Sequence, residues 1–340
     1  MNRPKILIIS DTPNWAISRN VDAIVKRLSH KYEFEKARLF RECGGNPRGY
    51  KFIMNVDVTR FDLVILRTIL HIGELKYAHI LRTNRNRLVA TIASHHGWGN
   101  ERKQFAGRIG DFGHIFCVSD NIYAGAREHI RGWKNKIYYT PQGIDTEIFK
   151  KYDRERGNKL VVGWAGNAAH GFGNDHKRFY GVIAPLARLL HEKYNFRIAV
   201  KNIKEKTKNM LVKNRIPILD IPFDEMPEFY NSVDVFLNAS KSEAIASTTV
   251  ESVGCGTPVI TTPVGHARNL IVNEKTGFVI EQNTNENLIK NFCGRLSTIE
   301  KMDIGKMRDV NRFIAKNILS WDILISHTDM AIAEALKSNV

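Results

Sequence analysis

Two glutamates in the second half of the chain have the side-chain type and the spacing that suit a polyhydroxylated ligand. Glu243 and Glu251 are separated by seven residues, and three hydroxyl side chains lie between them, Ser247, Thr248 and Thr249. Carboxylates accept paired hydrogen bonds from vicinal diols such as those of a ribose or a hexose. These side chains therefore predict a site that binds sugar hydroxyls.

The segment that carries these side chains predicts a strand, a loop and a helix, in that order. Residues 234–237 form a short apolar run typical of a buried strand, and residues 247–255 have the features of a helix that residues 256–258 end. The start of a helix exposes N–H groups and the positive end of the helix dipole. Both favour a diphosphate, so we expect one to bind where the loop enters the helix.

A structural role for Glu251 is compatible with the same residues. Thr248 and Glu251 have the spacing of a capping box, in which the two side chains bind backbone N–H groups at a helix start. Serine and threonine are also common N-cap residues. The residues alone leave both interpretations of Glu251 open, ligand binding and helix capping.

The order of motifs around the two glutamates resembles that of retaining glycosyltransferases with the GT-B fold, in particular the family 4 or group 1 enzymes. Glu251 is followed by the sequence Cys-Gly-Thr-Pro-Val-Ile at 255–260, by Gly265 and by Gly277-Phe278, in the order of that family. Further segments are similar to other family elements, namely residues 118–120, 141–149, 226–234 and 321–336. The resemblance covers nearly the whole chain and is stronger in the second half.

This resemblance implies a role for each motif residue. It assigns Glu243 to hydroxyls of the donor sugar and Glu251 to the ribose of the nucleotide. It also places the backbone N–H groups of Ala246, Ser247 and Thr248 at the diphosphate or the sugar. The donor it implies is a nucleoside diphosphate sugar, and we expect a UDP or GDP sugar with a saccharide or lipid-linked acceptor.

The family also uses a basic pair after the first strand of its second domain, and this chain departs from that pattern. Gly166 holds the glycine position, but Asn167 stands where arginine is usual. Losing that arginine removes a charge-assisted hydrogen bond of about 1.5–3 kcal/mol. Lys177 supplies the lysine, and Arg178 stands in place of the next glycine. We expect these four residues at the donor, and whether Arg178 replaces the missing arginine stays open.

A loop in the first half carries two histidines. Residues 94–99 read Ser-His-His-Gly-Trp-Gly and follow a predicted strand. Family members place a histidine near this point, beside the reacting sugar, so His95 or His96 would orient a donor hydroxyl or assist the acceptor. The sequence does not decide between the two, and a structural histidine is the alternative.

The mechanism that the resemblance implies uses neither a metal nor a cofactor. Metal-dependent sugar transfer usually needs an Asp-x-Asp pair at the diphosphate, and the chain has none. Lys177 and a helix dipole would instead stabilise the charge of the leaving nucleoside diphosphate. No enzyme nucleophile is evident, so the resemblance implies front-side attack with retention at the anomeric carbon.

The elements that must hold these residues alternate between strand and helix. This alternation predicts an α/β protein with parallel sheets covered by helices on both faces, in two Rossmann-like doubly wound domains facing a central cleft. The resemblance implies that this arrangement is the GT-B fold. We expect an acceptor domain over residues 1–145, a donor domain over 158–317 and a final helix over 318–340 that crosses back. The expected strands span residues 5–10, 63–66, 88–92, 114–118, 136–139, 159–164, 196–200, 216–221, 233–237, 259–261 and 278–280.

The composition narrows the expected binding partners and the expected cellular location. The chain has 340 residues and a formal net charge of +16, which favours polyanionic partners. Arg82, Arg85 and Arg87 suggest an anionic acceptor or membrane surface next to the first domain. The four cysteines are scattered, and no secretory signal or membrane-spanning run is present. We expect a cytoplasmic protein of polysaccharide biosynthesis, lying on the inner face of the membrane if its acceptor is lipid-linked.

Three other functions stay open on the sequence. A non-catalytic protein that binds a sugar nucleotide or a polyanion would explain the departures at Asn167 and Ala244. A nucleic-acid-binding protein would explain the basic run over 201–215, but no aromatic RNA-binding or zinc-finger pattern accompanies it, so we expect no nucleic acid. A GT-B sugar-nucleotide epimerase is the remaining enzyme alternative.

Overall fold

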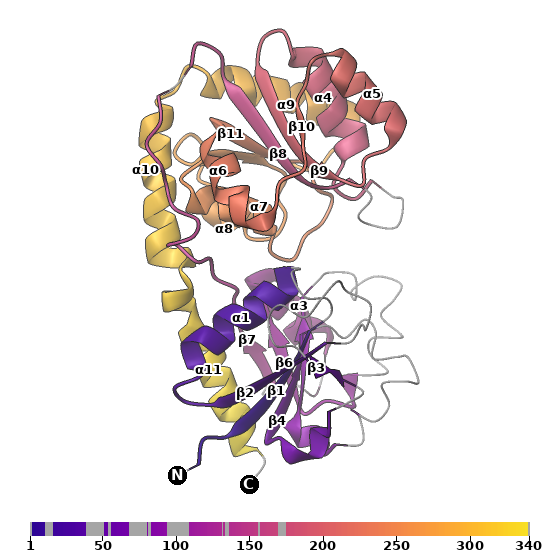
Figure 1. Cartoon of the computed structure of the whole chain (residues 1–340), viewed down its shortest axis with the longest axis vertical. Coiled ribbons are helices and arrows are strands. Elements are labelled where there is room, and N and C mark those ends of the chain that lie inside the picture. Colours follow the sequence, from indigo (N-terminus) through magenta and orange to yellow (C-terminus); the bar gives the residue numbers. More distant parts are fainter. Residues whose placement is uncertain are drawn as a thin grey trace. The chain divides into compact units, whose positions relative to one another are not determined.

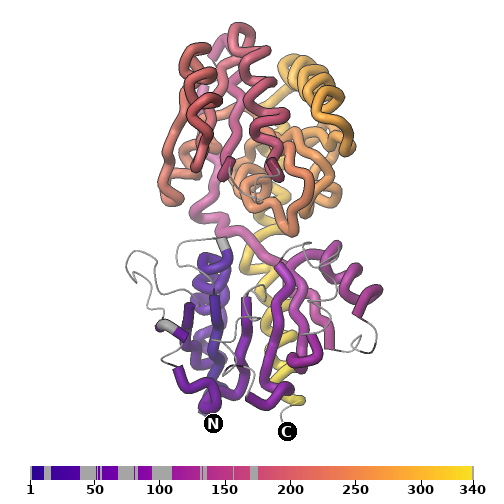
Figure 2. Tube along the Cα trace, turned by 90° about the vertical axis from the view of Figure 1, so that its right-hand side faces the viewer, coloured from indigo at the N-terminus to yellow at the C-terminus, as the bar shows by residue number. Residues whose placement is uncertain are grey.

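The structure is a computed structural model with two compact units. It describes residues 2–10, 16–38, 51–53, 56–67, 80, 83–93, 109–130, 132, 136–155, 157–168 and 175–338. Unit 1 comprises Met1–Gly143 together with Trp321–Val340, and unit 2 comprises Ile144–Ser320. Figure 2 follows the chain through both units, and its yellow C-terminal segment lies among the elements of unit 1.

Unit 1 is built on a parallel sheet with the strand order β3-β2-β1-β4-β5-β6-β7. Strands β4, β5 and β6 are buried along their whole length, and β1 from Ile6 onwards, because both faces of the sheet are covered. The strands span Lys5–Ser10 (β1), Glu33–Arg38 (β2), Lys51–Phe52 (β3), Leu63–Leu66 (β4), Leu88–Ile92 (β5), His114–Cys117 (β6) and Ile137–Tyr139 (β7). The helices of this unit span Ala16–Leu28 (α1), Val58–Arg60 (η2), Arg85–Arg87 (η5), Asp120–His129 (α3) and Trp321–Lys337 (α11).

The helix α11 confirms the prediction that the last helix returns to the first domain. It runs beside α1 (Figure 1), and the buried Trp321 and Ile332 of α11 share a core cluster with Val21 and Ile24 of α1. At the edge of this contact, Arg27 Nε lies 2.8 Å from a carboxylate oxygen of Asp322. No helix in the described part of the chain is both long and apolar enough to cross a bilayer.

Unit 2 is built on a second parallel sheet with the order β10-β9-β8-β11-β12-β13. Its strands span Val161–Asn167 (β8), Asn195–Lys201 (β9), Ile218–Leu219 (β10), Val235–Asn238 (β11), Val259–Thr261 (β12) and Gly277–Val279 (β13). Its helices span Phe179–Ile183 (η8), Ala184–Leu190 (α4), Glu205–Lys213 (α5), Phe223–Glu225 (η9), Met226–Asn231 (α6), Ser247–Gly254 (α7), Ala267–Leu270 (α8), Asn285–Ile299 (α9), Ile304–Ile314 (α10) and Ala315–Leu319 (η10). Two clusters of buried apolar side chains form the core of this unit.

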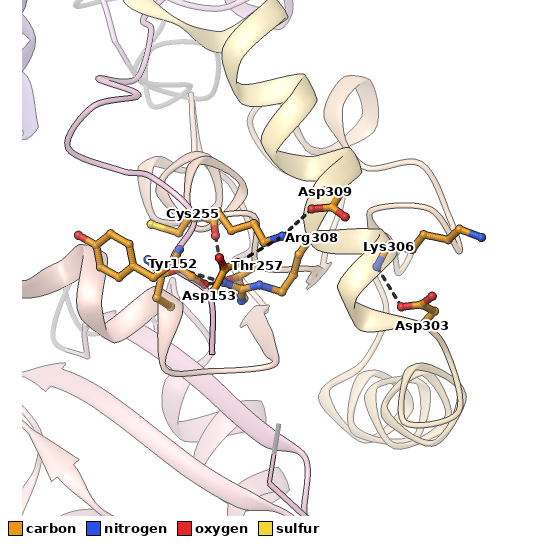
Figure 3. Close-up of polar contacts among 10 residues, drawn as sticks. Tyr152, Asp153, Cys255, Thr257, Asp303, Lys306, Arg308 and Asp309 are labelled. Atoms are coloured by element: carbon orange, nitrogen blue, oxygen red, sulfur yellow. Dashed lines mark hydrogen bonds and ion pairs between the residues drawn. The ribbon is translucent and has the colours of Figure 1, made fainter. Parts of the chain in front are cut away.

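The turn between α7 and β12 is fixed by a buried arginine of α10. Arg308 donates to the hydroxyl of Thr257 at 3.3 Å and to the carbonyls of Cys255 at 3.3 Å and Tyr152 at 3.4 Å (Figure 3). Gly256 has a φ of 80°, and a Cβ added there would lie 2.8 Å from the carbonyl oxygen of Arg308. Glycine at this position therefore lets the chain leave α7 and enter β12 under the arginine.

Candidate active site

The strand order of unit 2 reverses between β8 and β11, and the candidate site begins there. The chain goes from β8 to β9 on one side and from β11 to β12 on the other side. The loops that follow β8 and β11 therefore leave in opposite directions. In open α/β sheets, ligands bind beyond the carboxyl ends of the strands at such a switch point. Gly166 and Asn167 end β8, and Asn238 ends β11. The structure thus places two of the sequence-predicted donor residues at the switch point.

Lys177 and Glu243 meet at this edge of the sheet. Lys177 Nζ forms an ion pair with Glu243 Oε1, and Ser240 Oγ donates to the same oxygen at 2.7 Å. The side chains of Lys177 and Glu243 are 20% and 14% exposed, so water screens this pair less than it would a surface pair. The sequence predicted both residues for the site without predicting that they pair.

A tight turn positions Lys177. The carboxylate of Asp175 accepts hydrogen bonds from the backbone N–H groups of Tyr180 at 3.1 Å and Gly181 at 2.7 Å, at the start of η8. Asp175 and Arg178 have φ values of 44° and 50°, so the chain turns sharply on both sides of the lysine. Asp175 was not predicted from the sequence, because it lies three residues before the N-cap Arg178, outside the position where a capping aspartate is expected.

Arg178 is buried and turned into the protein. Its guanidinium donates to the carbonyl of Ala239 at 3.2 Å, to the side-chain oxygen of Gln282 and to the carbonyl of Asn283 at 3.5 Å. Burial lowers the pKa of the guanidinium from its usual value. The side chain therefore connects the turn after β8 with the segments after β11 and β13.

The helix α7 starts at Ser247, with Ala246 at the N-cap position and no side-chain cap. Thr248 is therefore inside the helix, whereas a capping box requires it at the N-cap. The helix-capping interpretation of Glu251 is thus wrong. The backbone N–H groups of Thr249 and Val250 bond to the carbonyl of Ala246 at 2.8 and 3.1 Å. The amides of Ala246, Ser247 and Thr248 precede these and form the entry of the helix.

Glu251 lies on the buried side of α7, where it contacts α6. The hydroxyl of Tyr230 donates to Glu251 Oε2 at 2.7 Å, and Tyr230 is fully buried. This contact fixes the rotamer of the carboxylate. Tyr230 is a further site residue that sequence analysis missed, because its position reads as a core residue of a short helix.

Gly265 supports the loop between the two glutamates. Its N–H donates to the carbonyl of Glu243 at 3.0 Å, and its φ is 56°. An added Cβ would lie 2.5 Å from the carbonyl carbon of Ile245. The close approach holds the backbone from Glu243 to Ala246, and this explains the motif glycine physically.

The two candidate histidines lie outside the described residues. His95 and His96 belong to a range, 94–108, for which the structure gives no placement. Arg82 is also outside, whereas Arg85 and Arg87 form η5. Within the described ranges, no three side chains of the His, Cys, Asp and Glu types come together as a metal-binding group.

Comparison with known proteins connects this geometry to a family. The family model described as "Glycosyl transferases group 1" matches residues 171–296, a range that contains Lys177, Glu243 and Glu251. A curated relative, the capsular polysaccharide biosynthesis glycosyltransferase CapM of Staphylococcus aureus, is 24% identical over 159 residues. That match covers 44% of this chain and 40% of CapM, so it spans well under half of the relative's length.

Solved structures are similar over the whole chain. A glycosyltransferase from Rickettsia africae has a TM-score of 0.75 at 17% identity, covering 99% of this chain and 100% of that one. Anabaena Alr3699/HepE, in complex with UDP-glucose, has a TM-score of 0.72 at 14% identity, with 99% and 100% covered. The chain therefore has the GT-B glycosyltransferase fold, and its second unit resembles the group 1 glycosyl transferases.

Proposed function

We propose that this protein is a retaining glycosyltransferase that moves a hexosyl group from a UDP or GDP sugar to a saccharide or lipid-linked acceptor. The observation that carries the proposal is the Lys177–Glu243 ion pair at the switch point of unit 2. It puts a cation suited to a diphosphate beside a carboxylate suited to sugar hydroxyls. The UDP-glucose complex of the similar Anabaena protein supports a nucleotide-sugar donor.

Each residue then has a distinct task. Lys177 and the entry of α7 bind the diphosphate and stabilise the negative charge that grows on it as it leaves. Glu243 accepts hydrogen bonds from the sugar hydroxyls. Glu251, oriented by Tyr230, accepts hydrogen bonds from the ribose. A bound donor would exchange the ion pair between Lys177 and Glu243 for contacts to phosphate and hydroxyl groups.

The reaction we propose needs neither a metal nor a cofactor. The acceptor hydroxyl oxygen forms a bond to the anomeric carbon on the face that the diphosphate leaves. The bond from that carbon to the phosphate oxygen breaks, and its electron pair remains on the diphosphate. The proton of the acceptor hydroxyl passes to the leaving phosphate oxygen. His95 and His96 remain proposed as residues that orient the donor or the acceptor.

An anionic acceptor or membrane is supported by a basic surface on unit 2. The segment from the end of β9 to Arg215, just after α5, carries one acidic side chain, Glu205, among the exposed basic side chains Lys201, Lys204, Lys206, Lys208, Lys213 and Arg215. Val212, on the same helix, is 59% exposed. Cations with an exposed apolar side chain fit the headgroup and the acyl edge of an anionic bilayer. The sequence had instead suggested the arginines at 82–87.

Donor binding without transfer is a second candidate function. It is favoured by one observation, that Asn167 replaces the usual arginine while the Arg178 guanidinium bonds to protein oxygens. Such a protein would bind a sugar nucleotide and release no nucleoside diphosphate.

One pair of measurements tests the proposed function. The melting temperature is measured with UDP, GDP, ADP and CMP and their common sugar conjugates, and nucleotide release is then followed with the sugar nucleotide that stabilises the protein. We expect stabilisation by one nucleotide and slow release even with water as the acceptor. Stabilisation without release on any saccharide or lipid-linked acceptor would favour the binding protein. Absence of stabilisation by every nucleotide would overturn both candidates.

A further inference from the structure

We infer that Arg178 and Gln282 form a clamp that positions Lys177 and Glu243, and that Arg178 does not itself bind the diphosphate. The clamp joins the segments that follow β8, β11 and β13. The inference rests on the proposed function for what the clamp serves, but the contacts that define it are present without a ligand.

The first half of the clamp is the arginine. Arg178 donates to the carbonyl of Ala239, in the loop after β11, at 3.2 Å. It also donates to the side-chain oxygen of Gln282 and to the carbonyl of Asn283, both after β13. With 8% of its surface exposed, the side chain lies within the protein. Three acceptors on two segments hold the guanidinium there.

The second half is the glutamine. Gln282 Nε2 donates to the carbonyls of Ser240 at 3.1 Å and Lys241 at 3.2 Å. The hydroxyl of Thr262 donates to the same Ser240 carbonyl at 2.7 Å. The amide of Gln282 therefore links the guanidinium of Arg178 to the backbone that leads into Glu243.

The clamp reaches the ion pair through adjacent residues. Arg178 follows Lys177 directly in the chain. Ser240, whose carbonyl the glutamine binds, donates its own hydroxyl to Glu243 Oε1 at 2.7 Å. The N–H of Lys241 also donates to the carbonyl of His176 at 2.9 Å, so the two loops are bonded backbone to backbone. Movement of either loop would therefore separate the lysine from the glutamate.

The backbone at Arg178 explains why an arginine at this position is unusual. Its φ of 50° is in the left-handed region, which glycine adopts without steric cost and an arginine does not. The strain is tolerated because the side chain gains one buried and two part-buried hydrogen bonds. The same geometry accounts for the glycine that the resemblance leads one to expect here, and it makes the clamp a property of this chain.

The matched variants are Gln282→Leu and Asn283→Ala. Gln282→Leu removes the oxygen that accepts from Arg178 and the nitrogen that donates to Ser240 and Lys241, at similar side-chain volume. The second is a control on the neighbouring residue, because the clamp uses the backbone carbonyl of Asn283 and not its side chain. A third variant, Gln282→Glu, keeps an oxygen for Arg178 and removes the donors to Ser240 and Lys241.

Amide hydrogen exchange tests the clamp without a ligand. We expect the Lys241 amide to exchange at least about tenfold faster in Gln282→Leu and Gln282→Glu than in Asn283→Ala, with all melting temperatures within about 2 °C of wild type. Equal exchange in the three variants, or an equal loss of global stability, would overturn the clamp whether or not the protein transfers sugar.

Kinetics with the sugar nucleotide found by the melting screen give the second readout. We expect Gln282→Leu to lower kcat at least about tenfold and to change the Kd of the bare nucleoside, which carries no phosphate for Lys177, less than about twofold, because Glu251 lies outside the clamp. An unchanged kcat in this variant, with Glu243→Ala inactive, would overturn the clamp and leave the proposed function standing. Inactivity of the wild-type protein would instead count against the proposed function, and exchange would still decide the clamp.

Discussion

Lys177 and Glu243 are 66 positions apart in the sequence, and their side chains form an ion pair where β8 and β11 end. The pair is held from both sides, by the turn in which Asp175 accepts the N–H groups of Tyr180 and Gly181 and by the hydroxyl of Ser240. Neither side chain is needed to build the core of the unit, whose buried clusters are apolar. Because the pair lies at the edge where we propose that the donor binds, we expect its substitution to change activity.

Replacing Glu243 should separate activity from folding. We expect Glu243→Gln to reduce sugar transfer by at least about a hundredfold, because an amide accepts hydrogen bonds from sugar hydroxyls less strongly than a carboxylate. The melting temperature should fall by only a few degrees, since Lys177 retains partial access to water. The control is Glu281→Gln, which alters an exposed ion pair with Arg268. Wild-type activity in Glu243→Gln would remove the central assignment.

Removing the hydroxyl of Tyr230 should weaken nucleotide binding specifically. The loss of its 2.7 Å hydrogen bond to Glu251 should raise the Kd of the nucleotide about three- to tenfold, corresponding to about 1 kcal/mol. Isothermal titration of Tyr230→Phe measures this. Tyr194→Phe is the matched control, because that hydroxyl binds Glu300 at 3.1 Å and not a site residue. Equal affinities in the two variants would show that Tyr230 does not orient Glu251.

Two glycines of unit 2 should respond in opposite directions to alanine. Gly256→Ala introduces a Cβ 2.8 Å from the Arg308 carbonyl at a φ of 80°, so we expect a loss of about 2 kcal/mol or more in unfolding free energy. Gly294 lies in α9 with nothing within 4 Å of an added Cβ. Gly294→Ala should therefore stabilise the protein by about 0.5–1 kcal/mol. Denaturant unfolding of both variants measures the contrast, and a neutral Gly256→Ala would contradict the packing described for this turn.

The buried histidine of β6 should make unit 1 sensitive to acid. Burial, with Lys136 nearby, lowers the pKa of His114 from 6.5 to about 4. The unfolded chain therefore binds a proton that the folded chain does not, and stability falls as the pH is lowered through 6.5 towards 4. The neutral state of His114 contributes about 3 kcal/mol to the unfolding free energy over that window. The full contribution is present above the pKa of the unfolded chain.

The measurement for His114 is the unfolding free energy of the wild type and of His114→Leu between pH 7.5 and about 4.5. We expect the variant to have a shallower slope with pH, whatever its absolute stability. Parallel curves would mean that His114 is protonated equally in the folded and unfolded states.

The basic surface of α5 should bind anionic membranes. We expect the protein to float with vesicles that contain phosphatidylglycerol at low salt and to be released by about 0.5 M NaCl, because salt screens such contacts. The double variant Lys206→Glu with Lys208→Glu should lose this binding. Lys290→Glu with Lys301→Glu changes the net charge equally on another exposed surface and should retain it. Equal floatation of the two double variants would contradict the proposed membrane surface.

Much of the fold could be predicted because its strands are local apolar runs. The predicted strands at 63–66 and 88–92 agree with β4 and β5, and the predicted helix at 247–255 with α7. Sequence analysis missed β2, where Ala37 is the one residue that is buried. This strand is stabilised by pairing with β1 and by ion pairs of Glu35 with Lys51 and Arg60. These contacts join residues far apart in the sequence, so a local sequence pattern does not predict them.

The candidate site also combines residues that local motifs predict with residues that depend on contacts far along the chain. Glu243, Glu251 and Lys177 could be found because their motifs are contiguous in the sequence. Tyr230 and Gln282 could not, because each acts through a hydrogen bond to a residue far along the chain. The role of Arg178 was open for the same reason, since a sequence does not show which way a buried guanidinium points.

The return of α11 to unit 1 affects the order in which the protein folds during synthesis. Unit 2 is one continuous stretch, so all of its elements are synthesised before α11. The core of unit 1, by contrast, is incomplete until Trp321 and Ile332 pack beside α1. The nascent chain should therefore expose all of unit 2 before α11 emerges and leave the apolar face of α1 uncovered until then, which makes that face a natural substrate for a chaperone.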